Sequence, residues 1–155
     1  MDKYPIRTAK IGDAPALAFL ATQLGYPTSP AQMADRLSHL LPDNDQAIFV
    51  IDDGSGRPVA WIHVYHHWLL EEGHFAEIGG LVTGEGFRRR GLGRQLMRAA
   101  EEWARQRGCA AMLLRSNVTR TEAHEFYRNI GYTNIKTSLT FIKRLDSEGQ
   151  AFPAT

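Results

Sequence analysis

The chain has 155 residues, a length typical of one domain built around one hydrophobic core. Apolar residues make up 43% of it and charged residues 23%, which excludes long disordered stretches. Its 18 basic and 17 acidic residues give a net charge of +1, so a general nucleic-acid-binding surface is not expected.

No apolar run approaches the roughly 20 residues that cross a bilayer, and the first residues lack the cationic and apolar layout of a signal peptide. We therefore expect a cytoplasmic protein with no membrane segment. Cys109 is the only cysteine, which excludes an internal disulfide and a cysteine metal cluster.

The N-terminal third predicts a short strand followed by two helices. Residues 4–9 are expected to form the strand, and Asp13 is expected to cap a helix that ends at Gly25. Residues 29–32 have a capping-box pattern with proline at the first helical position, so a second helix is expected from there to Pro42.

Three strands should follow, over residues 47–51, 59–65 and 75–82. The first two flank a glycine-rich turn and predict an antiparallel hairpin, and a loop is expected at 66–73. The third strand contains Gly79 and Gly80 in its interior. Glycine at such a position marks a bulge, or a close approach of another molecule to the backbone.

A strand, a tight loop and a helix are expected between Leu81 and Arg105. The loop carries Arg88–Gly93, after which apolar residues recur at helical spacing. Glycines at the start of a helix leave backbone N–H groups uncovered, and the helix end adds partial positive charge. This segment therefore predicts an anion site, most naturally for a phosphate, although Arg88–Arg90 and Arg94 could also form a solvated loop.

The last third of the chain predicts one buried strand, a short helix and two further strands. The long helix should end at Gly108, before a strand at 109–115 that is buried on both faces. A second capping-box pattern at 119–122 should start a helix that ends near Gly131. The last two strands are expected at about 132–135 and 139–145.

The predicted order is β-α-α-β-β-β-α-β-α-β-β. It describes a single α/β domain over residues 1–145, with a mixed, mostly antiparallel sheet and flanking helices, and a C-terminal tail over 146–155. The crossover between parallel strands starts at the glycine loop, and the crevice beyond the strand ends is a favoured ligand site in such a sheet.

Two phosphate-loop templates do not fit this segment. The chain lacks the lysine and hydroxyl of a Walker loop, and position 96 is not the glycine that Gly-x-Gly-x-x-Gly requires. Arg88–Gly93 instead resembles the Gln/Arg-x-x-Gly-x-Gly/Ala signature of the GNAT superfamily of N-acetyltransferases. The segment from Ser116 to Tyr132 resembles a later motif of that superfamily, and the element order over residues 4–145 is similar too.

This resemblance implies an N-acetyltransferase that uses acetyl-CoA. The loop amides and arginine side chains would bind the pyrophosphate, the strand before the loop would lie along the pantetheine arm, and Asn117 would hydrogen-bond that arm. Tyr127 would protonate the departing thiolate. The cofactor-binding residues that the resemblance implies are Leu81, Val82, Thr83, Arg88, Arg89, Arg90, Gly91, Leu92, Gly93, Arg94, Asn117 and Tyr127.

Direct transfer in a ternary complex needs a base, an oxyanion donor and an acid. Glu77 is the residue best placed to deprotonate the amine, directly or through water; the alternative is an exposed strand residue in a cross-strand ion pair. The Val82 amide would stabilise the oxyanion. Tyr127 has the alternative of packing in the core beside Phe126, and His124 is expected to be a structural, hydrogen-bonded histidine.

Six side chains in and around the expected loop raise the question of a metal: His63, His66, His67, His74, Glu71 and Glu72. No pair of them has a dependable ligand spacing on one element, so no metal site is expected. The segment 65–73 is expected instead to line the acceptor side or a subunit contact. A covalent route through Cys109 is not expected, because a thiol at the start of a buried strand is usually inert.

The expected partners are acetyl-CoA and an unidentified amine, which is either a small molecule or an exposed protein amine. Base rates alone allow a homodimer. A non-catalytic acyl-CoA-binding or sensing module is the alternative, and it would keep the glycine loop without needing Glu77 or Tyr127. The presence of Tyr127 favours the enzyme. The acceptor cannot be predicted, because acceptor pockets are built from loops.

Overall fold

The computed structural model describes residues 4–146. The chain divides into two compact units, Met1–Arg115 and Ser116–Thr155. Within the described residues, no helix is both long enough and apolar enough to cross a membrane. The expected tail at 146–155 falls, apart from its first residue, outside this described range.

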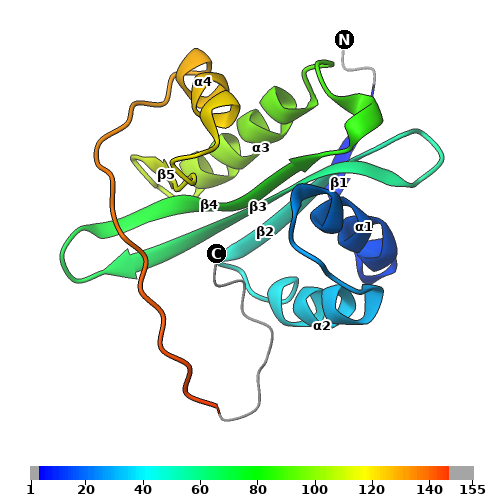
Figure 1. The fold of residues 1–155 in the computed structure, drawn as a ribbon, viewed down its shortest axis with the longest axis horizontal. Coiled ribbons are helices and arrows are strands. Elements are labelled where there is room, and N and C mark those ends of the chain that lie inside the picture. The colour runs from blue at the N-terminus through cyan, green and yellow to red at the C-terminus, as the bar shows by residue number, and fades with distance from the viewer. Residues whose placement is uncertain (1–3, 147–155) are drawn as a thin grey trace. The chain divides into compact units, whose positions relative to one another are not determined.

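The first unit is a mixed α/β sheet with flanking helices, which is the predicted fold class. Its elements in chain order are β1 (Ile6–Thr8), α1 (Ala14–Leu24), α2 (Pro30–Leu40), β2 (Gln46–Asp52), β3 (Pro58–Leu69), β4 (Gly73–Thr83), α3 (Leu92–Gln106) and β5 (Met112–Leu114). The sheet order is β1-β2-β3-β4-β5 (Figure 1). Neighbouring strands are antiparallel except for β4 and β5, which are parallel.

Helices cover both faces of this sheet. Helices α1 and α2 pack on one face and α3 on the other (Figure 1). The core under α1 and α2 contains Leu17, Ala18, Ala21, Met33, Leu37, Ile48 and Val50. Helix α3 buries Leu92, Leu96, Met97, Ala100, Trp103 and Ala104, which share one face at helical spacing. The periodicity of the sequence therefore predicted its inward face correctly.

Side-chain hydrogen bonds cap the start of α2, whereas the residue expected to cap α1 makes other contacts. The capping box of α2 is confirmed, because Ser29 Oγ accepts from Gln32 N–H at 3.1 Å and Gln32 Oε1 accepts from Ser29 N–H at 2.9 Å. Asp13 stands before α1, but its carboxylate accepts from Arg7 at 2.8 and 2.9 Å and from the Lys10 N–H at 2.9 Å. Asp13 thus ties β1 to the turn before α1 and does not cap α1.

The hairpin of β3 and β4 is longer than predicted. Most of the loop expected at 66–73 is strand, since β3 continues to Leu69 and pairs there with Gly73. The polar and aromatic side chains in this stretch contact one another across the strands. Trp68, for example, stacks on His74 with ring centroids 4.4 Å apart.

Strand β5 is shorter and less buried than predicted. The strand expected at 109–115 covers only Met112–Leu114, and each of its residues is half-buried. It is the last strand in the sheet order. The expectation of burial on both faces is therefore wrong, because a continuous apolar run does not reveal how many neighbours a strand has.

The second unit contains α4 (Thr121–Asn129). The strands expected at 132–135 and 139–145 are not formed, since the described residues after α4 hold no helix or strand. Their apolar residues include Leu139 and Phe141, which are 80% and 87% exposed. Alternating apolar residues form a strand only where a neighbouring strand completes the hydrogen-bond ladder, and none does so here among the described residues.

Candidate active site

Strand β4 contains the predicted bulge. The register with β3 shifts between His63 and Val64, which leaves Gly79 as the extra residue. A Cβ on Gly79 would lie 2.7 Å from Nδ1 of His63, and a Cβ on Gly80 would lie 3.0 Å from the Trp61 ring. Glycine is favoured at both positions because a side chain at Gly79 would clash with the His63 ring and one at Gly80 would crowd the Trp61 ring.

Strands β4 and β5 separate after the bulge. Their pairing covers residues 76–78 of β4, opposite 112–114 of β5, whereas β4 continues to Thr83. Among the described residues, no strand pairs with the outer edge of β4 beyond this point. The backbone groups of that edge are therefore open to a ligand.

Strand alternation determines which N–H groups point to this opening. The Gly84 N–H donates to a β3 carbonyl at 2.8 Å. Alternate residues of an antiparallel strand bond to the same neighbour, so the Val82 N–H also points to β3, and those of Leu81 and Thr83 point to the open edge. The expectation that Val82 provides the oxyanion donor is therefore wrong. Val82 contributes a buried side chain instead.

The loop before α3 is shaped by two residues with left-handed backbone. Arg89 has φ 64° and Gly91 has φ 78°. Gly91 precedes the first helical residue, and no side chain caps the helix. The N–H groups of Leu92, Gly93 and Arg94 donate to no other group among the described residues, as is usual in a first helical turn. Together with the positive helix end they have the geometry of an anion site.

The arginines of this loop add a local positive charge. All four are exposed: Arg88, Arg89, Arg90 and Arg94. Arg90 is held in place, since its Nη1 donates to the Tyr4 hydroxyl at 2.9 Å and its guanidinium lies 5.1 Å from the centre of the Phe87 ring. The loop therefore combines a fixed cation with others that are free to adjust to a ligand.

Glu77 is buried on the same face of the sheet as Trp61, with 4% of its surface exposed. Its Oε2 accepts a hydrogen bond from Arg115 Nη1 at 3.2 Å, and its Oε1 lies 3.4 Å from Nε2 of His67. Neither Oε1 nor that ring nitrogen has a hydrogen-bond partner among the described residues. The alternative for Glu77 was an exposed strand residue in a cross-strand ion pair. It is right about the ion pair and wrong about the exposure. The buried Oε1 thus lacks the hydrogen-bond partner that such an atom usually has.

Three aromatic rings of β3 lie on the same face of the sheet as the Glu77 carboxylate. Tyr65 lies directly opposite Glu77, and burial followed by the carboxylate raises the pKa of Tyr65 to about 12, so the phenol keeps its proton. Burial lowers the pKa of His63, whose Nε2 lies 2.6 Å from Gln46 Oε1, so this ring stays neutral. The Tyr65 ring lies 5.6 Å from that of His63 and 5.1 Å from that of His67.

Sequence reasoning selected Glu77 but missed three of its neighbours: Tyr65, His67 and Arg115. The available signal was the alternation of residues 63, 65 and 67, which places their side chains on one face of a strand. The shared face of His63 and His67 was considered only for a metal, and with a loop expected at 66–73 it was not connected to Glu77. Alternation gives no signal for Arg115, which follows β5.

The other two predicted functional residues lie in the second unit. Asn117 Oδ1 accepts from the N–H and hydroxyl of Thr119 at 3.0 and 2.9 Å, which leaves the Asn117 NH2 group as the donor for a ligand. The hydrogen bond expected for His124 is confirmed, since its Nε2 lies 2.9 Å from the Asn117 carbonyl oxygen. Tyr127 packs on Phe126, and burial raises the pKa of Tyr127, which keeps its hydroxyl protonated.

Burial also raises the pKa of the Cys109 thiol. A thiol with a raised pKa is a poor nucleophile at neutral pH. This agrees with the expectation that the reaction does not pass through a covalent intermediate on Cys109.

The geometry defines an α/β sheet that opens beside an anion site at a helix start, and sequence comparison identifies the family. The profile described as the acetyltransferase (GNAT) family matches residues 15–132. The chain therefore belongs to the GNAT family of acetyltransferases.

Two relatives found by sequence are N-acetyltransferases by name. An uncharacterised N-acetyltransferase of Methanocaldococcus jannaschii is 30% identical over 110 residues, which cover 68% of this chain and 49% of that protein. The chain thus spans about half the length of that relative. The aminoglycoside N(6')-acetyltransferase type 1 of Stenotrophomonas maltophilia is 26% identical over 140 residues, which cover 88% of this chain and 90% of that protein.

The fold is also known from solved structures. The crystal structure of a transcriptional regulator from Bacillus halodurans C-125 has a TM-score of 0.81 at 25% identity, over 90% of this chain and 99% of that chain. This likeness confirms the predicted fold class.

Proposed function

We propose that the chain is an N-acetyltransferase that moves the acetyl group of acetyl-CoA to a primary amine, by direct transfer in a ternary complex. The observation that carries this proposal is the separation of β4 from β5 directly before the uncapped start of α3. One continuous segment thereby offers strand N–H groups for a thioester arm and helix N–H groups for a pyrophosphate. Membership of the family supports the same cofactor.

In this proposal the cofactor lies along β4 and ends at the loop. The Thr83 N–H bonds the pantetheine arm, the Leu81 N–H faces the thioester carbonyl, and the Asn117 NH2 group donates to the arm. The pyrophosphate binds to backbone N–H groups of the loop, and the arginine side chains add charge. The complete set of proposed cofactor contacts is Leu81, Thr83, Arg88, Arg89, Arg90, Gly91, Leu92, Gly93, Arg94, Asn117 and Tyr127. Val82, which the resemblance also implied, points its N–H to β3 and is left out of this set.

The proposed reaction begins with loss of a proton from the ammonium form of the acceptor to Glu77, directly or through water. The amine lone pair then forms a bond to the thioester carbonyl carbon, and the Leu81 N–H stabilises the oxyanion. The C–S bond breaks, and Tyr127 protonates the thiolate. The acceptor gives up two protons in all, of which one replaces that of Tyr127 and the other passes to solvent.

A homodimer and a cytoplasmic location are parts of the same proposal. The tip of the β3–β4 hairpin exposes apolar side chains, those of Trp68, Leu69 and Leu70, which a second copy would cover. Light scattering of the purified protein, compared with a Trp68→Ser, Leu70→Ser variant, tests this part. A mass of one chain for the unaltered protein would contradict it.

The activity is tested by measuring release of the coenzyme A thiol with a panel of amines. The panel contains an aminoglycoside, which the name of the Stenotrophomonas relative suggests, together with a diamine and a peptide with a free N-terminal amine. We expect turnover of at least one acceptor, and a kcat about 100-fold lower in Tyr127→Phe. Cofactor binding without turnover of any amine, and no effect of Tyr127→Phe on a trace rate, would favour the non-catalytic acyl-CoA-binding or sensing module.

The cofactor site is tested separately by placing bulk in the loop. Gly91 has a positive φ, so any substitution there strains the backbone, whereas Gly93 lies inside α3. We expect Gly93→Leu to weaken acetyl-CoA binding more than about tenfold, measured by calorimetry, because the side chain covers the N–H groups of the helix start. Gln106→Leu, an exposed position at the far end of α3, is the control. Equal affinity of the two variants for acetyl-CoA would mean that the N–H groups at the start of α3 do not bind the cofactor.

A further inference from the structure

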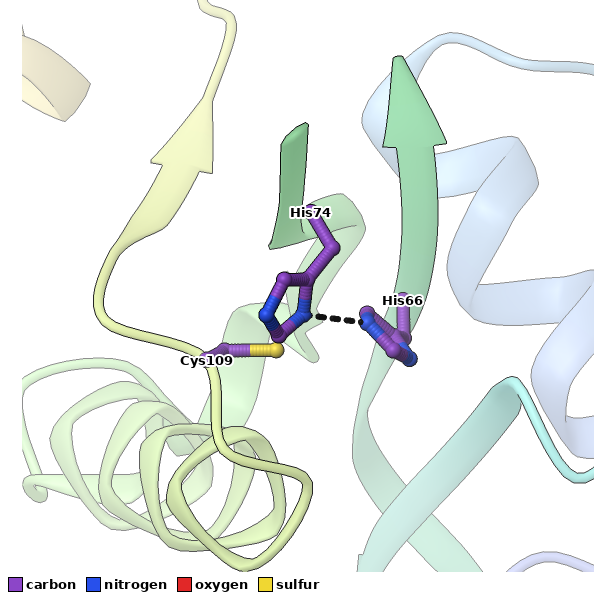
Figure 2. Close-up of side chains that lie close together, drawn as sticks. All are labelled: His66, His74 and Cys109. Carbon is purple, nitrogen blue, oxygen red and sulfur yellow. Dashed lines mark hydrogen bonds between the residues drawn. The ribbon is translucent and has the colours of Figure 1, made fainter. Parts of the chain in front are cut away.

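Three side chains that the proposed reaction does not use meet on the face of the sheet opposite to Glu77. His66 lies on β3, His74 on β4, and Cys109 in the connection between α3 and β5 (Figure 2). One ring nitrogen of each histidine and the Sγ of Cys109 lie within 4.8 Å of one another. Figure 2 shows the thiol pointing toward the two rings.

The strand register and the end of α3 bring these groups together. His66 is paired with Ala76, two residues from His74 on the same strand, so the two rings are diagonal neighbours on one face. Nε2 of His66 lies 2.9 Å from Nδ1 of His74. Gly108 has φ 75°, and the Cys109 N–H bonds back to the last turn of α3 at 3.1 Å, which fixes where the thiol emerges.

Two imidazole nitrogens and one thiolate form a donor set that Zn²⁺ prefers. With metal–ligand bonds of about 2.0–2.3 Å, a tetrahedral ion needs neighbouring donor atoms about 3.3–3.8 Å apart. The separations here run from 2.9 Å between the ring nitrogens to at most 4.8 Å. Side-chain shifts of about 1 Å would therefore create the site, with bonds to the metal replacing the contact between the two rings.

The surroundings already orient both rings. Nδ1 of His66, the nitrogen that does not face His74, lies 3.4 Å from Oδ1 of Asp45. Metal-bound histidines commonly donate their second N–H to a carboxylate, which fixes the tautomer and the ring orientation. The His66 side chain is only 12% exposed, and the His74 ring stacks on Trp68. The two rings thus need little reorganisation to bind an ion.

We propose that His66 Nε2, His74 Nδ1 and Cys109 Sγ bind one Zn²⁺, with Asp45 as the outer hydrogen-bond partner and water in the fourth position. The ion would tie the β3–β4 hairpin to the connection between α3 and β5, so its role is to stabilise the sheet edge. The expectation of no metal considered pairs on one element, whereas these ligands come from three elements and have no motif spacing.

The proposal is tested on the full chain after removal of metal with a chelator. Competition with a chromogenic chelator should give one Zn²⁺ per chain, and Co²⁺ should produce a thiolate charge-transfer band. We expect Cys109→Ser and His74→Gln to weaken Zn²⁺ binding more than about 100-fold, and Asp45→Asn about tenfold. His39→Gln, at an exposed histidine on α2, should bind like the unaltered protein.

Two measurements on the unaltered protein test the proposal without depending on whether a variant folds. Bound Zn²⁺ should protect Cys109 of the unaltered protein from alkylation, and a chelator should restore the rate. Zn²⁺ should also raise the melting temperature of the unaltered protein. Absence of stoichiometric binding, equal alkylation with and without Zn²⁺, or unchanged affinity in Cys109→Ser would each overturn the proposal.

Discussion

Glu77 has two different neighbours, one for each carboxylate oxygen. Arg115 satisfies Oε2, and Oε1 faces His67 without a hydrogen bond. A buried polar atom left without a partner is uncommon in a folded protein, so an incoming amine or water at Oε1 would gain a bond that the empty site lacks. The arrangement holds the carboxylate in place and leaves one oxygen without a hydrogen bond.

We expect Glu77→Gln to lower kcat for the accepted amine about 100-fold, because the amide cannot take the proton. The KM for acetyl-CoA should stay within about twofold, since Glu77 does not contact the proposed cofactor edge. Initial rates at saturating cofactor test this. Arg115→Gln is the matched control for loss of the ion pair, and it should leave most of kcat. A Glu77→Gln enzyme with unchanged kcat would give Glu77 a structural role alone.

At the scale of elements, the start of α2 was easier to predict than the extent of the strands, although the capping box expected at 119–122 is not formed at α4. The start of α2 depends on contacts between Ser29 and Gln32 within one turn, so a short sequence contains all the information. The extent of β3, β5 and the segment after α4 depends on partners distant in sequence, which local patterns do not reveal. The bulge in β4 was predictable because paired glycines inside a strand are unfavourable without a structural reason.

We expect Gly79→Ala to lower the free energy of unfolding by about 1–3 kcal/mol. The added methyl group would lie 2.7 Å from the His63 ring, which is itself held by its contact with Gln46. Urea denaturation measures the change. Gly86→Ala is the control, because a Cβ there meets nothing within 4 Å. Similar stabilities of the two variants would mean that the His63 ring gives way at little cost.

At the scale of the whole first unit, one guanidinium joins β1 to the turn before α1 and to the distant end of β2. Arg7 on β1 bonds Asp13 before α1 at 2.8 and 2.9 Å, and Asp52 at the end of β2 at 3.1 Å. Both carboxylates are buried. Burial alone would raise the pKa of Asp13, but hydrogen bonds from Arg7 and from the Lys10 N–H outweigh it and lower that pKa below 3.8.

The lowered pKa of Asp13 predicts a stability that depends on pH. A carboxylate whose folded-state pKa lies below its unfolded value stabilises the fold above the unfolded value, and this stabilisation is lost as pH falls through the folded-state pKa. The free energy of unfolding should therefore fall as pH drops below about 4. Asp13→Asn should cost about 2 kcal/mol at pH 7 and show a weaker decline in acid.

Urea denaturation at pH 7 and at pH 3 measures both effects. Asp35→Asn, at an exposed carboxylate on α2, is the control and should behave like the unaltered protein. An acid decline of the same size in Asp13→Asn as in the unaltered protein would contradict the assignment.

The bulge in β4 also changes which residues of the strand point to the same face of the sheet. Before it, Glu77 shares a face with Tyr65; after it, Val82 shares that face, because it lies opposite Trp61. In a regular strand, residues five positions apart point to opposite faces, so the extra residue is what lets Glu77 and Val82 share one face. One inserted residue therefore brings a buried carboxylate and a buried valine onto the same face of the sheet.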